Sequence, residues 1–252
     1  MYIREFVRLH NLNPLGVLHV GAHEAEESGE YLSNGFADRN RIIWVEAQPN
    51  LAAKLESSLD KKVHRVYCAV AWDTTGVKKV FNLTSKSASS SLFELEKHRK
   101  FYPEIDVVKR IEVTTVRLDS ILTEDDVFDF VVLDIQGAES QAIAGLGHWI
   151  NSVNWVYTEV SKKALYKGAT VFQDLETQMR SLGFSRVFTA WDRRAGWGDA
   201  LYARTSIYKV STKQRLLILV SRALRFLRSA LPQSVFPALV KIKKMIKSSN
   251  KI

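Results

Sequence analysis

The chain has 252 residues, of which 46% are hydrophobic, and this is enough apolar material for one large core domain. Its single cysteine excludes an internal disulfide framework, and no run of about twenty apolar residues predicts a transmembrane helix. The formal net charge is +9, but residues 211–252 hold ten basic side chains and no acidic one, so residues 1–210 are close to neutral. This distribution argues against a basic nucleic-acid-binding body.

Strands and helices alternate through the first part of the chain. The N-terminal residues contain Glu5 and no long apolar run, so no secretory signal is expected, and residues 1–13 predict a helix lying on a sheet. The elements predicted next are a strand over Val17–Val20, a helix over 25–33, a strand over 41–47, a helix over 51–59 with Asn50 as N-cap, and a strand over 63–70. Cys68 lies in that last strand and is interpreted as a packed thiol rather than a nucleophile.

The second part continues the alternation and then closes with a hairpin. Strands are predicted over 77–83, 111–116, 127–135 and 153–160, helices after Glu139 and after a capping box formed by Thr170 and Gln173, and two last strands over 184–190 and 200–210. The small hydroxyl-rich segment 84–91 is either a flexible linker or an ordered loop that covers a ligand. The pattern predicts a Rossmann-like, doubly wound, mostly parallel α/β sheet with an antiparallel C-terminal hairpin, in a domain over residues 1–210.

Candidate ligand groups come at the ends of the predicted strands, where such a sheet binds its ligands. Gly21 allows close backbone approach after the first strand, and Glu46 ends the second strand, where a carboxylate can accept both hydroxyls of a ribose. The later glycines of a dinucleotide fingerprint are absent, because Ala22, His23 and Glu24 follow Gly21. A cofactor with a ribose and no phosphate, such as S-adenosylmethionine, therefore fits better than NAD.

A series of motifs supports this interpretation. In chain order they are Val-Gly-Ala-His at 20–23, Trp-Val-Glu-Ala-Gln-Pro-Asn at 44–50, Ala-Val-Ala-Trp-Asp-Thr-Thr-Gly at 69–76, Ser-Ser-Ser-Leu at 89–92, Leu-Asp-Ser-Ile-Leu at 118–122, Leu-Asp-Ile-Gln-Gly-Ala-Glu at 133–139, Thr-Glu-Val-Ser at 158–161 and Gly-Asp-Ala-Leu-Tyr at 198–202. In this order and spacing they resemble the FkbM-type, S-adenosylmethionine-dependent methyltransferases. The resemblance covers roughly residues 15–208.

The resemblance implies a class I methyltransferase fold with a seven-stranded sheet, and methyl transfer to an oxygen, often that of a sugar hydroxyl. By position, it implies that the cofactor contacts are Gly21, Ala22 and His23 for the methionine part, Glu46 and Ala47 for the ribose, Ala69 and Val70 for the adenine, and also Asp134. Many members carry Asp where this chain has His19. His23, Glu24 or Glu26 is a candidate to replace that carboxylate.

Methyl transfer to an alcohol also requires a base for the hydroxyl proton. Asp134 and Glu159 are the candidate catalytic residues, while Glu139 is equally well explained as an acid in the first turn of a helix. His19 is interpreted as a hydrogen-bonded core imidazole, and no metal site is expected. Ser89–Ser91 are expected to fold over the cofactor or acceptor. Trp191, Trp197 and Tyr202 are candidates for stacking on a sugar ring, with ordinary packing as the alternative.

The tail over residues 211–252 combines an apolar stripe at helical spacing with flanking basic residues, so it predicts an amphipathic helix that lies on an anionic membrane surface. Docking to a partner helix or to the body of the protein is the alternative, and nucleic acid is disfavoured. The leading hypothesis is a cytoplasmic O-methyltransferase, with peripheral contact to the inner membrane face, that acts on a glycan, glycolipid or other saccharide. A non-catalytic binding or scaffold protein with the same fold is the alternative, motivated by His19.

Overall fold

The computed structural model describes residues 3–94, 104–162, 168–192 and 196–208, together with some residues of 212–223. The chain divides into two compact units, the first comprising Met1 and residues 13–208 and the second comprising residues 2–12 and 209–252. Helix α1 (Ile3–His10) belongs to the second unit. Within the described segments, no helix is both long and apolar enough to cross a bilayer. Most of the basic tail lies outside the described residues.

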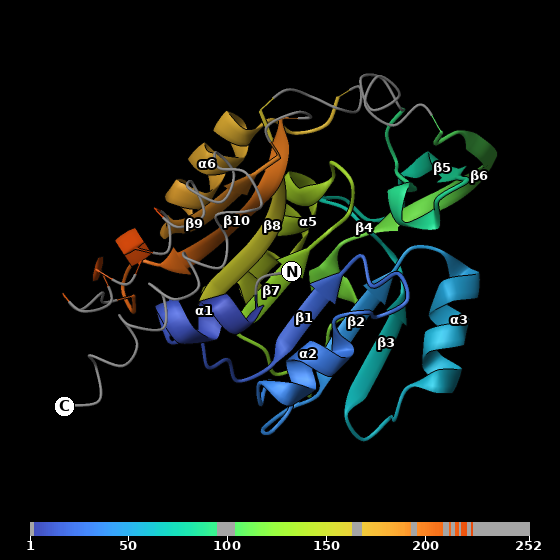
Figure 1. The fold of residues 1–252 in the computed structure, drawn as a ribbon. Coiled ribbons are helices and arrows are strands. Elements are labelled where there is room, and N and C mark those ends of the chain that lie inside the picture. The colour runs from blue at the N-terminus through green and yellow to red at the C-terminus, as the bar shows by residue number, and fades with distance from the viewer. Residues whose placement is uncertain are drawn as a thin grey trace, which may run out of the picture. The chain divides into compact units, whose positions relative to one another are not determined.

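The first unit is built on a seven-stranded sheet with the strand order β3-β2-β1-β7-β8-β10-β9 (Figure 1). The strands are β1 (Val17–Val20), β2 (Ile42–Glu46), β3 (His64–Cys68), β7 (Phe130–Leu133), β8 (Trp155–Ser161), β9 (Phe184–Trp191) and β10 (Trp197–Arg204). The neighbouring pairs β3–β2, β2–β1, β1–β7 and β7–β8 are parallel. Strand β10 is antiparallel to both of its neighbours, β8 and β9. The predicted seven-stranded, mostly parallel sheet with a closing antiparallel hairpin is confirmed.

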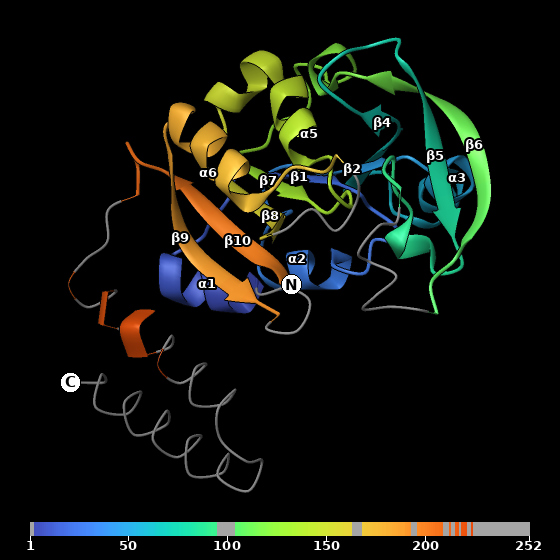
Figure 2. The ribbon, with the colours of Figure 1, turned by 90° about the horizontal axis from the view of Figure 1, so that it is seen from above.

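A small second sheet lies beside the main one in the same unit. Its order is β4-β6-β5, formed by β4 (Val70–Ala71), β5 (Lys78–Thr84) and β6 (Val107–Val116), and Figure 2 shows β5 and β6 side by side. The sequence predicted strands here but not a separate sheet. The 3-10 turn η1 (Ser87–Ser89) follows β5, so the second sheet fixes the start of the hydroxyl-rich segment.

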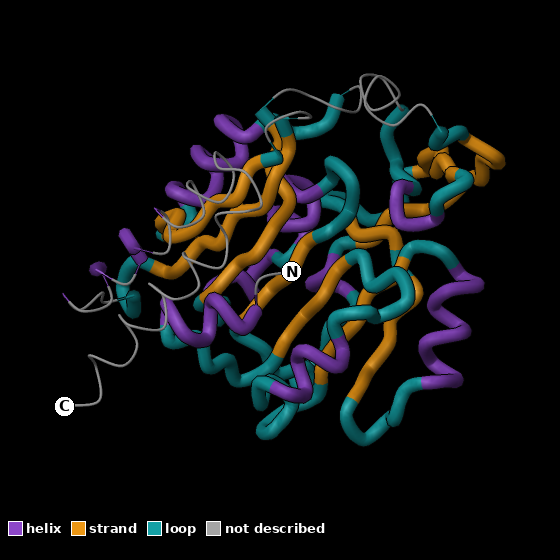
Figure 3. Tube along the Cα trace, in the orientation of Figure 1, coloured by secondary structure: helices purple, strands orange, loops and turns teal. Residues whose placement is uncertain are grey.

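Helices cover both faces of the main sheet, as the alternation of helix and strand along the chain requires (Figure 3). On one face, α5 (Glu139–Gly145) and α6 (Phe172–Ser181) contribute Ala142, Ile143, Leu175 and Met179 to a core with Leu18, Val20, Ile43 and Val45 of β1 and β2. Helix α3 (Pro49–Ser58) packs beside β2 and β3. The short turns η2 (Leu118–Ser120) and η3 (Gly147–Asn151) complete the unit.

His19 belongs to an aromatic cluster on the opposite face. Its ring lies 5.0 Å from that of Trp44, its partner across the parallel β1–β2 pair, and its Nδ1 lies 3.1 Å from the hydroxyl of Tyr31 in α2 (Ser28–Ser33). Burial lowers the pKa of His19 to about 3, so the ring is neutral. The structure therefore agrees with the interpretation of His19 as a core imidazole.

Four local predictions are wrong. The strand predicted over 63–70 is divided, because β3 ends at Cys68 and Val70 begins β4 of the second sheet. Asn50 is not the N-cap of α3, because Pro49 takes the first helical turn and Gln48 precedes the helix. Thr170 and Gln173 form no capping box, because α6 begins at Phe172 after Val171, with no side-chain cap. Cys68 is exposed rather than packed, because β3 is an edge strand of the sheet. Partial desolvation and the nearby Glu46 raise the pKa of the Cys68 thiol, which still argues against a nucleophile.

Candidate functional site

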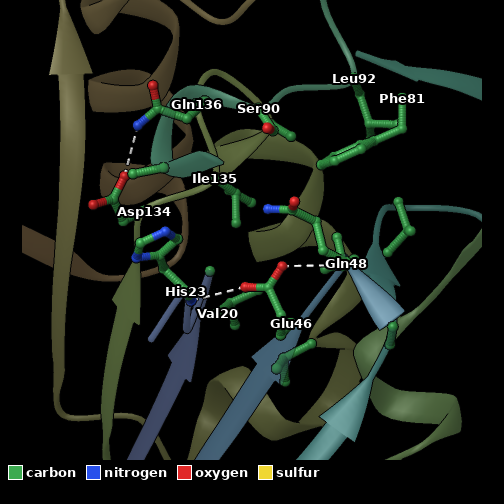
Figure 4. Close-up of a pocket in the computed structure, with 18 of the residues that line it drawn as sticks. Val20, His23, Glu46, Gln48, Phe81, Ser90, Leu92, Asp134, Ile135 and Gln136 are labelled. Atoms are coloured by element: carbon green, nitrogen blue, oxygen red, sulfur yellow. Dashed lines mark hydrogen bonds between the residues drawn. The ribbon is translucent and has the colours of Figure 1, made fainter. Parts of the chain in front are cut away.

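A pocket of about 640 Å³, open to solvent, lies at the carboxyl ends of β1, β2 and β7 (Figure 4). The chain runs outward from β1 to β3 and then returns to β7 on the other side of β1, so the pocket adjoins the point where strand order reverses. Residues of the second sheet and the segment after it form the opposite wall. Its lining includes Val20, Gly21, His23, Val45, Glu46, Ala47, Gln48, Ala69, Val70, Ala71, Phe81, Ser87, Ala88, Ser90, Leu92, Asp134, Ile135, Gln136 and Ala138.

Gly21 is required by the backbone at the base of this pocket. Its φ is +90°, and a Cβ placed on it would lie 1.9 Å from the carbonyl oxygen of Asp134. The Asp134 N–H donates to the Val20 carbonyl at 3.0 Å, so the ends of β1 and β7 stay in contact beyond the strands. The sequence predicted that a ligand approaches the Gly21 backbone closely. In this structure the group that lies close to Gly21 is the Asp134 carbonyl of the chain itself.

Glu46 is held rigidly at the end of β2. One carboxylate oxygen accepts the His23 N–H and the other accepts the Gln48 N–H, each at 2.8 Å, as Figure 4 shows. The residue is 4% exposed, and burial raises the pKa of its carboxyl although these hydrogen bonds oppose the shift. Each oxygen keeps a further lone pair, so the carboxylate can accept hydroxyl groups from a ligand in the pocket.

His23 links the base of the pocket to the hydroxyl-rich segment. Its Nδ1 lies 2.6 Å from a carboxylate oxygen of Glu26, and its Nε2 lies 2.7 Å from the Ser87 hydroxyl. Its φ is +47°, a conformation that a non-glycine residue adopts rarely and that often marks a functional site. The Gln48 amide also donates to the Ser87 carbonyl at 3.4 Å.

The segment over residues 84–91 is an ordered loop, so the flexible-linker alternative does not apply to it. Ser89, Ser90 and Ser91 are buried, and the Ser91 hydroxyl donates to the Gln136 carbonyl at 2.8 Å. Of these three serines, only Ser90 lines the pocket, and Ser87 lies in it as well. Their expected role above a ligand remains a prediction.

Most of the predicted cofactor contacts meet in this pocket. Gly21, His23, Glu46, Ala47, Ala69, Val70 and Asp134 line it, whereas Ala22 is buried behind it and does not. Apolar side chains, among them Phe81 of β5, Leu92 and Ile135, form a wall suited to a flat apolar ring. His19 does not line the pocket, and Glu24 instead forms an ion pair with Lys54 at 2.7 Å.

The two candidate catalytic carboxylates are joined by a single side chain. The Gln136 amide nitrogen donates to Asp134 Oδ1 at 2.8 Å and to Glu159 Oε2 at 3.0 Å. Asp134 follows β7 directly and lines the large pocket, in contact with solvent, while Glu159 lies on β8. Gln136 has a φ of +53°, so its backbone is held in an unusual conformation where its side chain makes this bridge.

Two further acids surround this pair. Asp199 on β10 lies directly opposite Glu159 across the antiparallel β8–β10 pair, and Glu139 opens α5. Burial raises the pKa of Glu139 to about 7 and that of Asp199 to about 6. Burial also raises the pKa of Glu159 well above the usual range, with Asp134, Glu139 and Asp199 adding to the effect.

Glu139 and Glu159 line a smaller pocket of about 380 Å³ together with Gly137, Val160, Ser161, Ala169, Thr170, Phe172 and Leu175. The residues proposed to stack on a sugar do not line either pocket. Tyr202 is fully buried and its hydroxyl donates to Glu176, so its ring is not available to a ligand. Trp191 packs edge-on against Phe172, and the Lys162 ammonium lies 4.7 Å from its ring centre. Trp197 is half-buried at the start of β10.

In the part of the chain that the structure describes, no group of three or more His, Cys, Asp or Glu side chains is arranged to hold a metal ion.

Sequence reasoning missed Gln48, Ser87, Gln136 and Asp199, which make the contacts described above. Gln136 and Asp199 lie inside motifs that the sequence made visible, Leu-Asp-Ile-Gln-Gly-Ala-Glu and Gly-Asp-Ala-Leu-Tyr. Ser87 lies in the hydroxyl-rich segment 84–91, but its pairing with His23, 64 positions away, left no signal in the sequence.

Comparison with known proteins identifies related chains. Residues 19–186 match the family described as the methyltransferase FkbM domain. The 2-O-methyltransferase NoeI of Sinorhizobium fredii is 34% identical over 161 residues, and the match covers 60% of this chain and 65% of that protein. The aligned part is thus slightly less than two thirds of the relative's length.

Solved structures show only distant similarity. An FkbM methyltransferase from Methylobacillus flagellatus matches with a TM-score of 0.46 and 15% identity, covering 75% of this chain and 43% of that one. Magnesium protoporphyrin IX methyltransferase from Synechocystis, with bound S-adenosylmethionine, matches with a TM-score of 0.41 and 12% identity, covering 81% and 76%.

Proposed function

Because this chain belongs to the FkbM methyltransferase domain family, we propose that it is an S-adenosylmethionine-dependent O-methyltransferase. The observation that carries the proposal is the placement of Glu46. A buried carboxylate, fixed through both oxygens at the end of β2, faces a pocket with apolar walls at the reversal of strand order. That combination suits a nucleoside, whose ribose needs hydroxyl acceptors and whose base needs an apolar slot.

The residues present fit this cofactor. Glu46 would hold the ribose hydroxyls, and Ala69 and Val70, with Phe81, Leu92 and Ile135, would enclose the adenine. The turn from Gly21 to His23 would lie along the methionine part. Asp134 also lines the pocket, as the Gly21–His23 turn does, and its carboxyl group suits a ligand that carries positive charge. The pocket lacks a glycine-rich cradle for a pyrophosphate, which argues against a dinucleotide.

When bound, S-adenosylmethionine supplies a methyl group activated by the positive sulfur. The chain has to orient an acceptor oxygen and to take up its proton. Asp134 is the candidate for the proton, because its carboxyl faces the large pocket in contact with solvent. Glu159 lies on the other side of the Gln136 bridge and lines the smaller pocket.

The proposed acceptor is a hydroxyl of a glycan, a glycolipid or another saccharide. The family resemblance supports this choice, and the relative named as a 2-O-methyltransferase supports an oxygen acceptor. The basic, apolar-striped sequence over 211–252 supports peripheral binding to anionic membranes, where a glycolipid acceptor would be presented. The scaffold alternative rested on the missing carboxylate at His19, and His19 lies in the core rather than in the pocket.

Calorimetric titration with S-adenosylmethionine tests the cofactor part of the proposal. The native protein should bind, and Glu46→Gln should bind about 10- to 100-fold more weakly, the range expected when hydrogen bonds to a charged group are lost. Glu112→Gln is the matched control, because Glu112 is an exposed residue of β6 paired with Lys78. A correctly folded native protein that binds no S-adenosylmethionine would refute the proposal.

The acceptor part is tested separately with tritium-labelled S-adenosylmethionine. Neutral oligosaccharides, uronic-acid oligosaccharides and glycolipid extracts should be offered in parallel, and label should enter at least one of them as an alkali-stable methyl ether. Label in protein or nucleic acid instead would contradict a saccharide acceptor while leaving the methyltransferase assignment intact.

A further inference from the structure

We infer that Gln136 is a positioning residue that gives Asp134 and Glu159 unequal roles, keeping Asp134 as the ionised group and leaving the proton on Glu159. The first support is the bridge itself. One carboxamide nitrogen has two N–H groups, and the 2.8 Å and 3.0 Å hydrogen bonds use both of them, one on each acid. A carboxamide keeps these protons at all ordinary pH values, so the two accepting oxygens are both unprotonated.

The bridge is fixed on both sides. Gln136 has a φ of +53° and the next residue, Gly137, has a φ of +107°, where an added Cβ would lie 2.7 Å from the Ala169 side chain. The Ser91 hydroxyl holds the Gln136 carbonyl at 2.8 Å. The loop after β5 and the turn after β7 therefore fix the backbone of the residue whose side chain joins the two acids.

The surroundings of the two acids differ in charge. Asp134 faces His23 and Glu26 from the turn after β1, with the Gln136 hydrogen bond favouring its charged form. Among the residues that the structure describes, the ionisable groups that raise the pKa of Glu159 are the carboxyl groups of Asp134 after β7, Glu139 on α5 and Asp199 on β10. The Tyr157 hydroxyl on β8 donates a hydrogen bond to the Asp199 carboxyl group. Burial raises the pKa of Glu27, which precedes α2, and the charge of Asp134 also contributes to this shift.

These differences decide where a single shared proton resides. Two carboxylates bridged by one amide cannot both be charged without strong repulsion in a partly desolvated site, so one of them retains its proton. Glu159 lies opposite Asp199 across the β8–β10 pair and shares the smaller pocket with Glu139, whereas Asp134 lies at the large pocket in contact with solvent. Glu159 is therefore the protonated partner, with its second oxygen as the donor, and Asp134 is the free base.

The consequence for methyl transfer rests on the proposed function. Asp134, charged and facing the large pocket, would accept the hydroxyl proton of the acceptor, and neutral Glu159 would hydrogen-bond the acceptor without competing for that proton. Replacing Gln136 would then alter the pH dependence of the reaction more than the binding of the cofactor, which separates a positioning role from a structural one.

Carbon-13 NMR of protein labelled at the Asp and Glu carboxyl carbons tests the ionisation directly, without acceptor or cofactor. Asp134→Asn and Glu159→Gln identify the two signals. In the native protein Asp134 should titrate at lower pH than Glu159. In Gln136→Met the Asp134 midpoint should rise towards that of Glu159. In Asp134→Asn the Glu159 midpoint should fall, because a facing charge has been removed.

Gln178→Met is the matched control, because the Gln178 amide binds Ser140 and neither acid, and it should leave both titrations unchanged. The inference is overturned if Glu159 ionises before Asp134, or if a folded Gln136→Met leaves the Asp134 midpoint in place. If Gln136→Met does not fold, two results still test the inference. They are the order in which Asp134 and Glu159 titrate in the native protein and the shift of the Glu159 midpoint in Asp134→Asn. Failure of cofactor binding, measured separately, would count against the proposed function and not against these titrations.

Discussion

The ring of His23 and the hydroxyl of Ser87 meet at 2.7 Å, across 64 positions of sequence, and tie the turn after β1 to the loop after β5. Glu26 holds the other ring nitrogen at 2.6 Å, so the imidazole is oriented from both sides. The contact lies at the pocket, and a ligand bound beneath it would have to break it or pass beside it to leave.

Ser87→Ala should therefore release the cofactor product faster. Loss of one hydrogen bond of about 1 kcal/mol predicts roughly a fivefold higher dissociation rate of S-adenosylhomocysteine, measured by stopped-flow fluorescence. Ser57→Ala is the control, because the Ser57 hydroxyl binds only the Lys54 carbonyl on α3. An unchanged rate in Ser87→Ala would show that this contact does not retain the ligand.

Gly21→Ala should destabilise the fold strongly. The substitution forces an L side chain to a φ of +90° and places its Cβ against the Asp134 carbonyl, so the unfolding free energy should fall by more than about 2 kcal/mol in urea denaturation. Gly29→Ala on α2 is the matched control. Its Cβ would meet nothing within 4 Å and alanine favours a helix, so stability should rise by up to about 1 kcal/mol.

Glu139 should make the protein less stable as the pH rises. Its folded pKa of about 7 lies above the ordinary glutamate pKa of 4.5, so the folded state binds the proton more tightly than the unfolded chain between these values. Stability is therefore fully present below about pH 4.5 and is lost as the pH rises through about 7, by up to about 3 kcal/mol for this group.

Denaturation at pH 5 and at pH 8 measures this effect. Glu139→Gln cannot ionise but keeps an oxygen for the Gly137 N–H, which donates to Glu139 at 3.0 Å in the native protein. The variant should lose less stability than the native protein between the two pH values. An equal loss in both proteins would mean that Glu139 is ionised in the fold throughout this range.

The basic tail should govern membrane binding. Each basic residue near an anionic surface contributes about 1 kcal/mol, so replacing Lys243, Lys244 and Lys247 with Gln should reduce sedimentation with phosphatidylserine liposomes by at least about tenfold. The control replaces Lys61, Lys62 and Lys109 with Gln, which removes the same charge from the body. Native protein that ignores these liposomes would rule out the interfacial role.

The main sheet and one side of the pocket were predictable because they follow from local patterns. The apolar runs at 17–20, 41–47 and 127–135 mark buried parallel strands, and the residues that end them meet at one edge of the sheet by necessity. Gly21, Glu46 and Asp134 could thus be placed together from sequence alone. The resemblance to a family added the cofactor, which no local pattern identifies by itself.

The remaining features depend on contacts between distant segments. The apolar neighbours of Cys68 in the sequence predict a buried residue, but the strand order places β3 at an edge of the sheet, where Cys68 is exposed. The Asn50 prediction failed because Pro49 starts the helix one residue earlier. The bridge by Gln136 and the pairing of Asp199 with Glu159 follow from an unusual backbone conformation and an antiparallel register, neither of which a one-dimensional pattern encodes.

The pocket walls come from two separate sheets, and this couples ligand binding to the completeness of folding. A cofactor held between Glu46 of the main sheet and Phe81 of the second one would bind only molecules in which both sheets are in place. Mass action then favours those molecules, and the fraction of molecules with the small sheet open falls as the ligand concentration rises above the dissociation constant. Amide hydrogen exchange at Asn82 and Ser91, whose N–H groups pair with each other's carbonyls, would report pocket occupancy from outside the nucleoside site.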